Sequence, residues 1–300
     1  MEPLGRPGPE RPRFDTPNIL WFFGGFVAAA AGGGVLAQVP SSARGAWILL
    51  AALGCSAALA ALAAALLRAG WEVPGGVLAT MAVTFAPVAA GAFEKLVGVW
   101  PHASPLDPLE AFQGWLFALP LVTAAAGLVA FALVRFHFAL ALVAFSTFLA
   151  AELLLPVFVS APGPGDHASA FVVTGAALLA VGIALDLRAA RRAAFWWHLV
   201  GLLALAAGLS YHAFRHASWG WILILVAGTL LLLLAASLAR ATWGVFGVLG
   251  FFAPIAHYLD VWLGNLAVAF ALAGVGLGLV VLGIAVRLLW RPFQPPPLRA

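Results

Sequence analysis

The chain of 300 residues is 64% hydrophobic and only 9% charged, with a mean hydropathy of +1.06. A soluble domain carries about 25% charged residues, so a water-soluble fold could not cover its surface with so few charges. The net charge of +4 comes from 15 basic residues that are spread along the chain and form no stripe, which excludes the phosphate-tracking surface of a nucleic-acid-binding protein. We therefore expect an all-α integral membrane protein whose main partner is the lipid bilayer, with no nucleic acid partner.

Ten apolar segments are long enough to cross a bilayer, since a membrane helix needs about 20 apolar residues. In chain order they lie at 18–39, 45–67, 73–93, 112–134, 136–160, 168–186, 195–214, 218–239, 242–263 and 264–288. The first is longer than the apolar region of a secretory signal, so we expect it to be retained. The sequence predicts a polytopic bundle of about ten helices in one domain over 18–288, with a flexible leader over 1–17 and a Pro-rich tail over 289–300.

The basic residues predict the orientation of this bundle, because short loops rich in Lys and Arg stay in the cytoplasm. With ten spans, twelve of the fifteen lie on the side of the N-terminus, and only Arg44, Lys95 and Arg215 lie on the other. Both termini are therefore predicted to be cytoplasmic. Many Ala, Gly, Arg and Pro residues beside a single lysine are typical of a GC-rich bacterial genome, so we predict a multi-pass protein of the bacterial inner membrane.

One pattern occurs twice, over residues 45–89 and 220–256. Each copy has an outer tryptophan, a descending helix that ends in arginine, a second tryptophan three residues later, and an ascending helix with the letters FAPVA or FAPIA. Interfacial Trp and cytoplasmic Arg are common in membrane helices without ancestry, so duplication and chance both remain open. Transporters often grow from repeats with broken helices, which makes Pro87, Pro156 and Pro254 candidate hinges. The alternative for each proline is a packing role alone.

Small residues at four-residue spacing occur in the first and last segments. Gly24, Ala28 and Gly32 share one helix face, as do Gly274 and Gly278. This spacing lets helix backbones approach closely. It predicts interhelical contacts, within the chain or between copies in a homo-oligomer.

Glu152 is the strongest candidate for a functional side chain, because ionisable groups inside a bilayer are costly and are functional hypotheses by default. It lies well inside the segment 136–160, and we expect it to face the bundle interior. It would there be a carboxylate that binds a proton or a cation, with Ser146 and Thr147 as neutral ligands on the same helix. The alternative is a hydrogen-bonded structural carboxyl.

A second polar group gathers on the outer half of the predicted bundle. His257 and Asp260 are three residues apart and so share a helix face, and His212 and His216 are four apart. Such pairs suit a proton path or a metal site. The alternative interpretation is interfacial polar residues that reach headgroups and water, and it also covers His137 and His198 at inner helix ends. No nucleotide-binding, GxSxG or redox-cofactor motif occurs, so we assign no catalytic residue, cofactor or metal ligand.

In overall plan, about 300 residues in ten short-looped helices, the chain resembles bacterial drug and metabolite transporters of the ten-helix type. It departs from them because their halves are five-helix inverted repeats, whereas the repeat here has an offset of six helices. The leader, RFDTPN followed by LWFFG at residues 13–24, resembles the start of several bacterial multi-span inner-membrane families of unassigned role. Neither resemblance carries a substrate or a site residue.

These observations leave three classes of function open. The first is a secondary transporter or permease for a small molecule or ion, with Glu152, His257 and Asp260 along a proton or cation path. The second is a non-transporting membrane scaffold or sensor whose polar residues are structural. The third is a membrane-embedded enzyme or metal-binding protein that uses the outer histidines.

Overall fold

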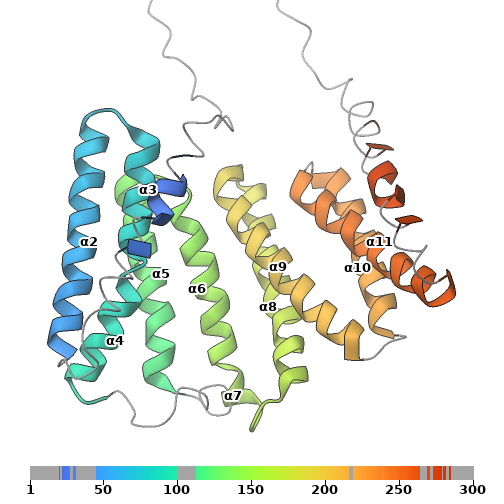
Figure 1. The fold of residues 1–300 in the computed structure, drawn as a ribbon, viewed down its shortest axis with the longest axis horizontal. Coiled ribbons are helices and arrows are strands. Elements are labelled where there is room, and N and C mark those ends of the chain that lie inside the picture. Colours follow the sequence, from blue (N-terminus) through green and yellow to red (C-terminus); the bar gives the residue numbers. More distant parts are fainter. Residues whose placement is uncertain are drawn as a thin grey trace, which may run out of the picture. The chain divides into compact units, whose positions relative to one another are not determined.

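The computed structural model describes residues 45–99, 113–215, 219–238 and 240–263, with short pieces between 20 and 31 and between 269 and 284. Within these residues the regular structure is helical throughout (Figure 1). The main helices are α2 (Gly45–Arg68), α3 (Glu72–Val83), α4 (Ala86–Leu96), α5 (Gly114–Val134), α6 (Ala139–Leu153), α7 (Leu155–Phe158), α8 (Pro164–Leu187), α9 (Arg191–Arg215), α10 (Trp219–Leu238) and α11 (Ala241–Leu263).

Eight helical segments in the described part of the chain are long and apolar enough to cross a membrane. Two of these eight segments each consist of two shorter helices that follow one another, α3 with α4 and α6 with α7. Large apolar side chains such as Leu133, Phe158 and Leu187 are exposed on these helices, which is stable in lipid and not in water. The chain therefore has the build of an all-helical, multi-pass membrane protein. Eight of the ten predicted spans are confirmed as such helices, whereas 18–39 and 264–288 lie largely outside the described residues.

The helices group into two compact units, unit 1 over residues 1–161 and unit 2 over residues 162–300. In unit 1, α3 is the central helix, because it contacts α2, α5 and α6. Seven of its twelve residues are buried: Gly75, Gly76, Val77, Thr80, Met81, Ala82 and Val83. Its glycines permit this packing, since a methyl group at Gly76 would collide with the ring of Phe136.

Unit 2 is built around the antiparallel hairpin of α8 and α9 (Figure 1). Small buried residues recur every seven positions on both helices, at Ala168, Gly175 and Gly182 of α8 and at Ala194, Gly201 and Gly208 of α9. A methyl group at Gly175 would lie 2.8 Å from the carbonyl oxygen of Gly201, and one at Gly201 would lie 2.9 Å from that of Gly175. The two backbones are therefore in direct contact, as small residues allow in membrane helices.

Helices α10 and α11 form a second hairpin that is packed together by the same means and contacts α9. A methyl group at Gly228 of α10 would collide with the backbone of Gly250 in α11. Beside this contact lies a cluster of buried apolar side chains: Leu179, Leu202, Leu231 and Trp243. This cluster joins α8 and α9 to α10 and α11 within unit 2.

The predicted small-residue contacts have mixed outcomes. Gly274 and Gly278 both face the ring of Phe252 in α11, with a methyl group at Gly278 placed 2.7 Å from it. Gly24 has open space around it among the described residues, so no close contact within the chain is found there, and a contact between copies stays a prediction. The neighbouring Gly25 is the buried residue, and it faces Val77 of α3. Ala28 and Gly32 lie outside the described residues.

Candidate functional site

The first feature of the site is an interruption between α3 and α4. The helix breaks at Thr84 and Phe85, and Pro87 lies in the first turn of α4. Pro87 has no N–H group to donate into the preceding turn, so the helical hydrogen bonds cannot run through unbroken. Ser56 of α2 donates a hydrogen bond of 3.0 Å to the carbonyl oxygen of Ala82. Such a side chain satisfies a backbone group at a break in a membrane helix, where no water is at hand.

A second interruption separates α6 from α7 and lies beside the predicted carboxylate. The break falls at Leu154, and Pro156 is in the first turn of α7. Glu152 precedes the break by two residues and is only 6% exposed. It lies roughly 20 Å along the rise from the start of α6, inside a hydrocarbon core of about 30 Å. The expectation that Glu152 points into the bundle interior agrees with its burial.

Among the described residues of unit 1, the buried polar side chains come from three helices, α3, α5 and α6. They are Thr80 of α3, Thr123 of α5, and Ser146 and Glu152 of α6, and these helices pack on one another. Thr80 and Thr123 each donate to a carbonyl one turn earlier, at 2.9 and 2.8 Å. Thr147, in contrast, is exposed and bonds to the carbonyl of Val143. Of the two predicted neutral ligands, Ser146 alone is buried.

The other predicted site residues belong to unit 2. His257 of α11 stacks flat on Trp221 of α10, with ring centroids 4.3 Å apart, and it meets Tyr258 edge to face at 5.5 Å. Asp260 is exposed. Pro254 is fully buried within a continuous α11, so it differs from Pro87 and Pro156, which follow breaks. Whether these prolines act as hinges stays a prediction.

The outer histidines form no metal centre within the described part of the chain, where no three His, Cys, Asp or Glu side chains gather. His212 shares a hydrogen bond of 3.3 Å with Ser169 of α8. His216 and His102 lie outside the described residues. The metal-binding alternative therefore has no support from the described residues.

A polar cluster that the sequence did not reveal lies where α8 ends and α9 and α11 begin. The carboxylate of Asp186 accepts a hydrogen bond from His198 Nε2 at 2.9 Å and forms an ion pair with the guanidinium of Arg240, whose Nε donates at 3.1 Å. Arg240 also donates to the carbonyl of Arg191 at 3.0 Å. This cluster, Asp186–His198–Arg240, ties both hairpins of unit 2 together at one end.

The interpretation of His198 as an interfacial side chain is wrong, because its ring is 0% exposed. Gly182 of α8 makes room for it, since a methyl group there would lie 2.6 Å from the imidazole Nδ1. The ring of Trp243 packs edge to face on it, with centroids 5.1 Å apart. One sequence signal could have found the cluster: Asp186 ends a long apolar run, and a carboxylate in that position requires a partner.

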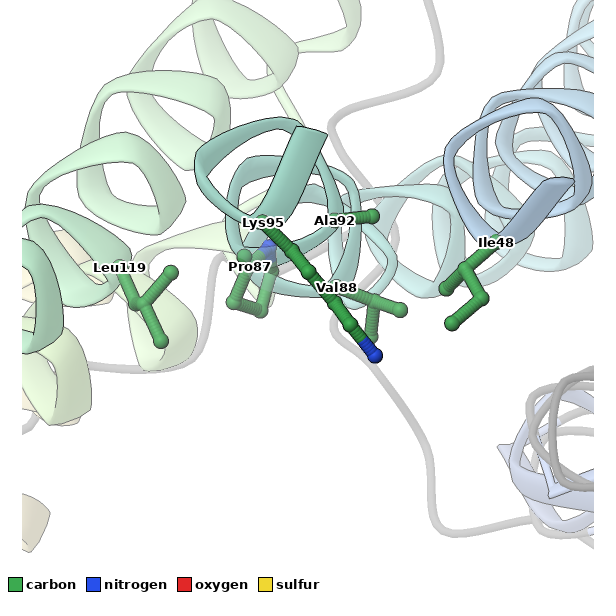
Figure 2. Close-up of a pocket in the computed structure, with 7 residues that line it drawn as sticks. Ile48, Pro87, Val88, Ala92, Lys95 and Leu119 are labelled. Carbon is green, nitrogen blue, oxygen red and sulfur yellow. The ribbon is translucent and has the colours of Figure 1, made fainter. Parts of the chain in front are cut away.

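Unit 1 also has an open hollow of about 450 Å³ between α2, α4 and α5 (Figure 2). Its lining is apolar apart from Lys95: Ile48, Pro87, Val88, Gly91, Ala92, Lys95 and Leu119. Glu152 is not among these residues. The hollow and the buried carboxylate are therefore separate features of unit 1.

Comparisons with protein-family models, with curated proteins and with solved structures give no match. Chemically, the described part of unit 1 has a buried carboxylate, Glu152, beside one break, a buried hydroxyl, Thr80, one turn before the other, and further buried hydroxyls on α5 and α6. Breaks of this kind free backbone carbonyls, which together with a carboxylate are suited to hold a proton or a small cation.

Proposed function

We propose that the chain is a secondary transporter or permease of the bacterial inner membrane, with ten spans and both termini in the cytoplasm. Its cargo is a small molecule or an ion, and Glu152 is the group that takes up a proton or cation during the cycle. The observation that carries the proposal is a buried carboxylate, Glu152, that lies two residues before the interruption of a membrane helix. Transporter sites are typically built at discontinuous helices within the bilayer.

The second interrupted helix supports the same proposal. The breaks in α3–α4 and α6–α7 lie roughly 18 and 22 Å from the starts of their helices, which is a similar depth. Both helices ascend in the predicted topology, and α3 contacts α6. Breaks at similar depth in two neighbouring helices leave backbone groups that need partners inside the bilayer, and transporter sites use such groups. The polar residues beside them, Thr80 and Glu152, are both buried.

The experiment is transport in vesicles reconstituted with purified protein. An imposed pH gradient is used to drive uptake across a panel of small-molecule and cation substrates, and wild type is compared with Glu152→Gln. We expect at least a tenfold loss of gradient-driven flux, because the amide cannot exchange a proton. Glu72→Gln is the matched control, since Glu72 is an exposed carboxylate at the start of α3, and it should transport as wild type does.

Two outcomes would count against the proposal. Equal flux in wild type and Glu152→Gln would remove this carboxylate from the mechanism. Failure of the wild type to move any member of the panel would favour the scaffold or sensor alternative, in which the polar residues of unit 1 are structural.

A further inference from the structure

The hollow beside Lys95 has the features of a lipid site. Among the described residues it is open along one side, and six of its seven lining residues present only apolar side chains or a glycine. Water does not fill such a space well, because an ordered water needs two to four polar partners. An empty hollow would also lose the van der Waals contacts of its walls. Lipid surrounds a membrane-crossing unit, and its acyl chains are as apolar as the lining of this hollow. An acyl chain is therefore the expected occupant.

Lys95 adds a charge to one end of this apolar surface. Figure 2 shows its side chain passing over Val88, with the ammonium nitrogen toward the open side, between Leu119 of α5 and Ile48 of α2. Lys95 is the single lysine of the chain and is exposed. Glu94, the adjacent carboxylate, does not line the hollow. Lys95 is thus the one charged residue in the described lining, and it attracts a negative charge to this end of the hollow.

The position of Lys95 corresponds to the headgroup level of a bilayer. It lies in the last turn of α4, at the end of a membrane crossing. The first turn of α2 packs against it, since a methyl group at Gly45 would lie 3.5 Å from Lys95 Cβ. That turn also holds Trp47, which is exposed, and exposed tryptophans are typical of the membrane interface. The free N–H groups in the first turn of α2 have a partial positive charge, which adds to the positive charge of the lysine.

The apolar part of the hollow extends from this level into the bilayer. From Lys95 to Pro87 is roughly 12 Å of helix rise along α4, and the lining residues between them are Val88, Gly91 and Ala92. The hollow's size of about 450 Å³ is within the range of roughly 300–1,000 Å³ that small-molecule sites occupy. The hollow is therefore long and large enough to hold a segment of a lipid acyl chain.

We propose that this hollow, lined by Ile48, Val88 and Leu119 with Lys95 at its end, binds a phospholipid with an anionic headgroup. One acyl chain lies in the hollow and the phosphate group pairs with the lysine, which favours a headgroup such as phosphatidylglycerol that has no ammonium group to repel the lysine. The proposal does not depend on transport, because it concerns a different surface of unit 1 from Glu152.

Lipid retention tests this proposal directly. The full-length protein is reconstituted in nanodiscs of equimolar phosphatidylglycerol and phosphatidylcholine, then released into mild detergent, and the retained lipids are counted by native mass spectrometry. We expect the ratio of retained phosphatidylglycerol to phosphatidylcholine to fall about fivefold in Lys95→Gln. Lys95→Arg should keep the wild-type ratio, and Arg68→Gln, which removes an exposed arginine at the end of α2, is the matched control.

A second variant tests the apolar part of the hollow. Val88→Trp fills the space that the acyl chain would occupy, so it should reduce the total lipid retained, with both headgroups affected. An unchanged lipid ratio in Lys95→Gln, an equal fall in Arg68→Gln, or full lipid retention in Val88→Trp would each overturn the proposal. Circular dichroism of every variant ensures that the comparison is made between folded proteins.

Discussion

The two copies of the repeated pattern are used differently in the two units. In unit 2, Trp243 is 1% exposed and Arg240 pairs with Asp186. In unit 1, the corresponding Trp71 is 53% exposed, and Arg68 is also exposed. The same spacing of arginine and tryptophan therefore produces an anchored connection in one place and an outward-facing one in the other.

The difference comes from what lies beside each connection. In unit 2 the hairpin of α8 and α9 presents Asp186 and His198 to the start of α11, so Arg240 meets a carboxylate and Trp243 meets an imidazole. In unit 1, Arg68 and Trp71 remain on the surface, where interfacial Trp and cytoplasmic Arg are common for topological reasons alone. The same local motif in a membrane helix is thus buried in one unit and exposed in the other, according to how the neighbouring helices pack.

Removing the tryptophans is the change with the largest expected effect. Trp243→Ala should lower the free energy of unfolding by about 3–5 kcal/mol, because it leaves a cavity among Leu179, Leu202 and Leu231. Trp71→Ala should change it by less than about 0.5 kcal/mol, as expected for an exposed side chain. Denaturant titration in mild detergent, followed by circular dichroism, measures both. Equal losses in the two variants would show that burial does not distinguish the two copies.

Neutralising the arginines should also change the free energy of unfolding by different amounts in the two units, but the difference should be smaller than for the tryptophans. Arg240→Gln leaves the carboxylate of Asp186 without its guanidinium and should cost about 3 kcal/mol, whereas Arg68→Gln should stay within about 0.5 kcal/mol of wild type. The double variant Asp186→Asn with Arg240→Gln should lose less than the sum of its single changes, with a coupling of about 1–3 kcal/mol. Strict additivity in the same detergent titration would mean that the ion pair contributes nothing.

Replacing a glycine by alanine in the first helix of each repeat, α2 or α10, should change the stability in opposite directions. Gly228→Ala forces α10 away from α11 and should destabilise by about 1–3 kcal/mol, since the backbone of Gly250 is in direct contact. Gly54 of α2 has open space around it, so Gly54→Ala should stabilise by up to about 1 kcal/mol through helix propensity. Thermal unfolding midpoints compare the two. A stabilising Gly228→Ala would contradict the close packing of unit 2.

Hydropathy was sufficient to predict the eight membrane-crossing helices that the described residues contain, because each crossing requires about 20 apolar residues in a row. The burial of Glu152 could also be predicted, since a carboxylate within such a run avoids lipid. The breaks were harder to foresee, because prolines alone do not determine them. Pro87 and Pro156 follow interruptions, whereas Pro254 occurs inside a continuous helix.

Contacts between distant residues could not be predicted from the pattern. Asp186 meets Arg240 across 54 residues of sequence and His198 across 12, and each pairing depends on how the hairpins of unit 2 dock. The recurrence of small residues every seven positions on α8 and α9 was visible in the sequence, and it indicates a close antiparallel contact. Gly24 shows the limit of such spacing, because the buried residue is its neighbour, Gly25.

The most direct test of the account is which side of the membrane each helix connection reaches. Single cysteines are placed at Gly70, Gly98, Ala161 and Ala189, which lie in the turns between the helices, in a Cys55→Ala background. Intact cells are then treated with a membrane-impermeant maleimide. We predict labelling at Gly98 and Ala161, with Gly70 and Ala189 labelled only after the membrane is opened. Equal labelling of Gly70 and Gly98 in intact cells would contradict the claim that α3 and α4 together cross the bilayer.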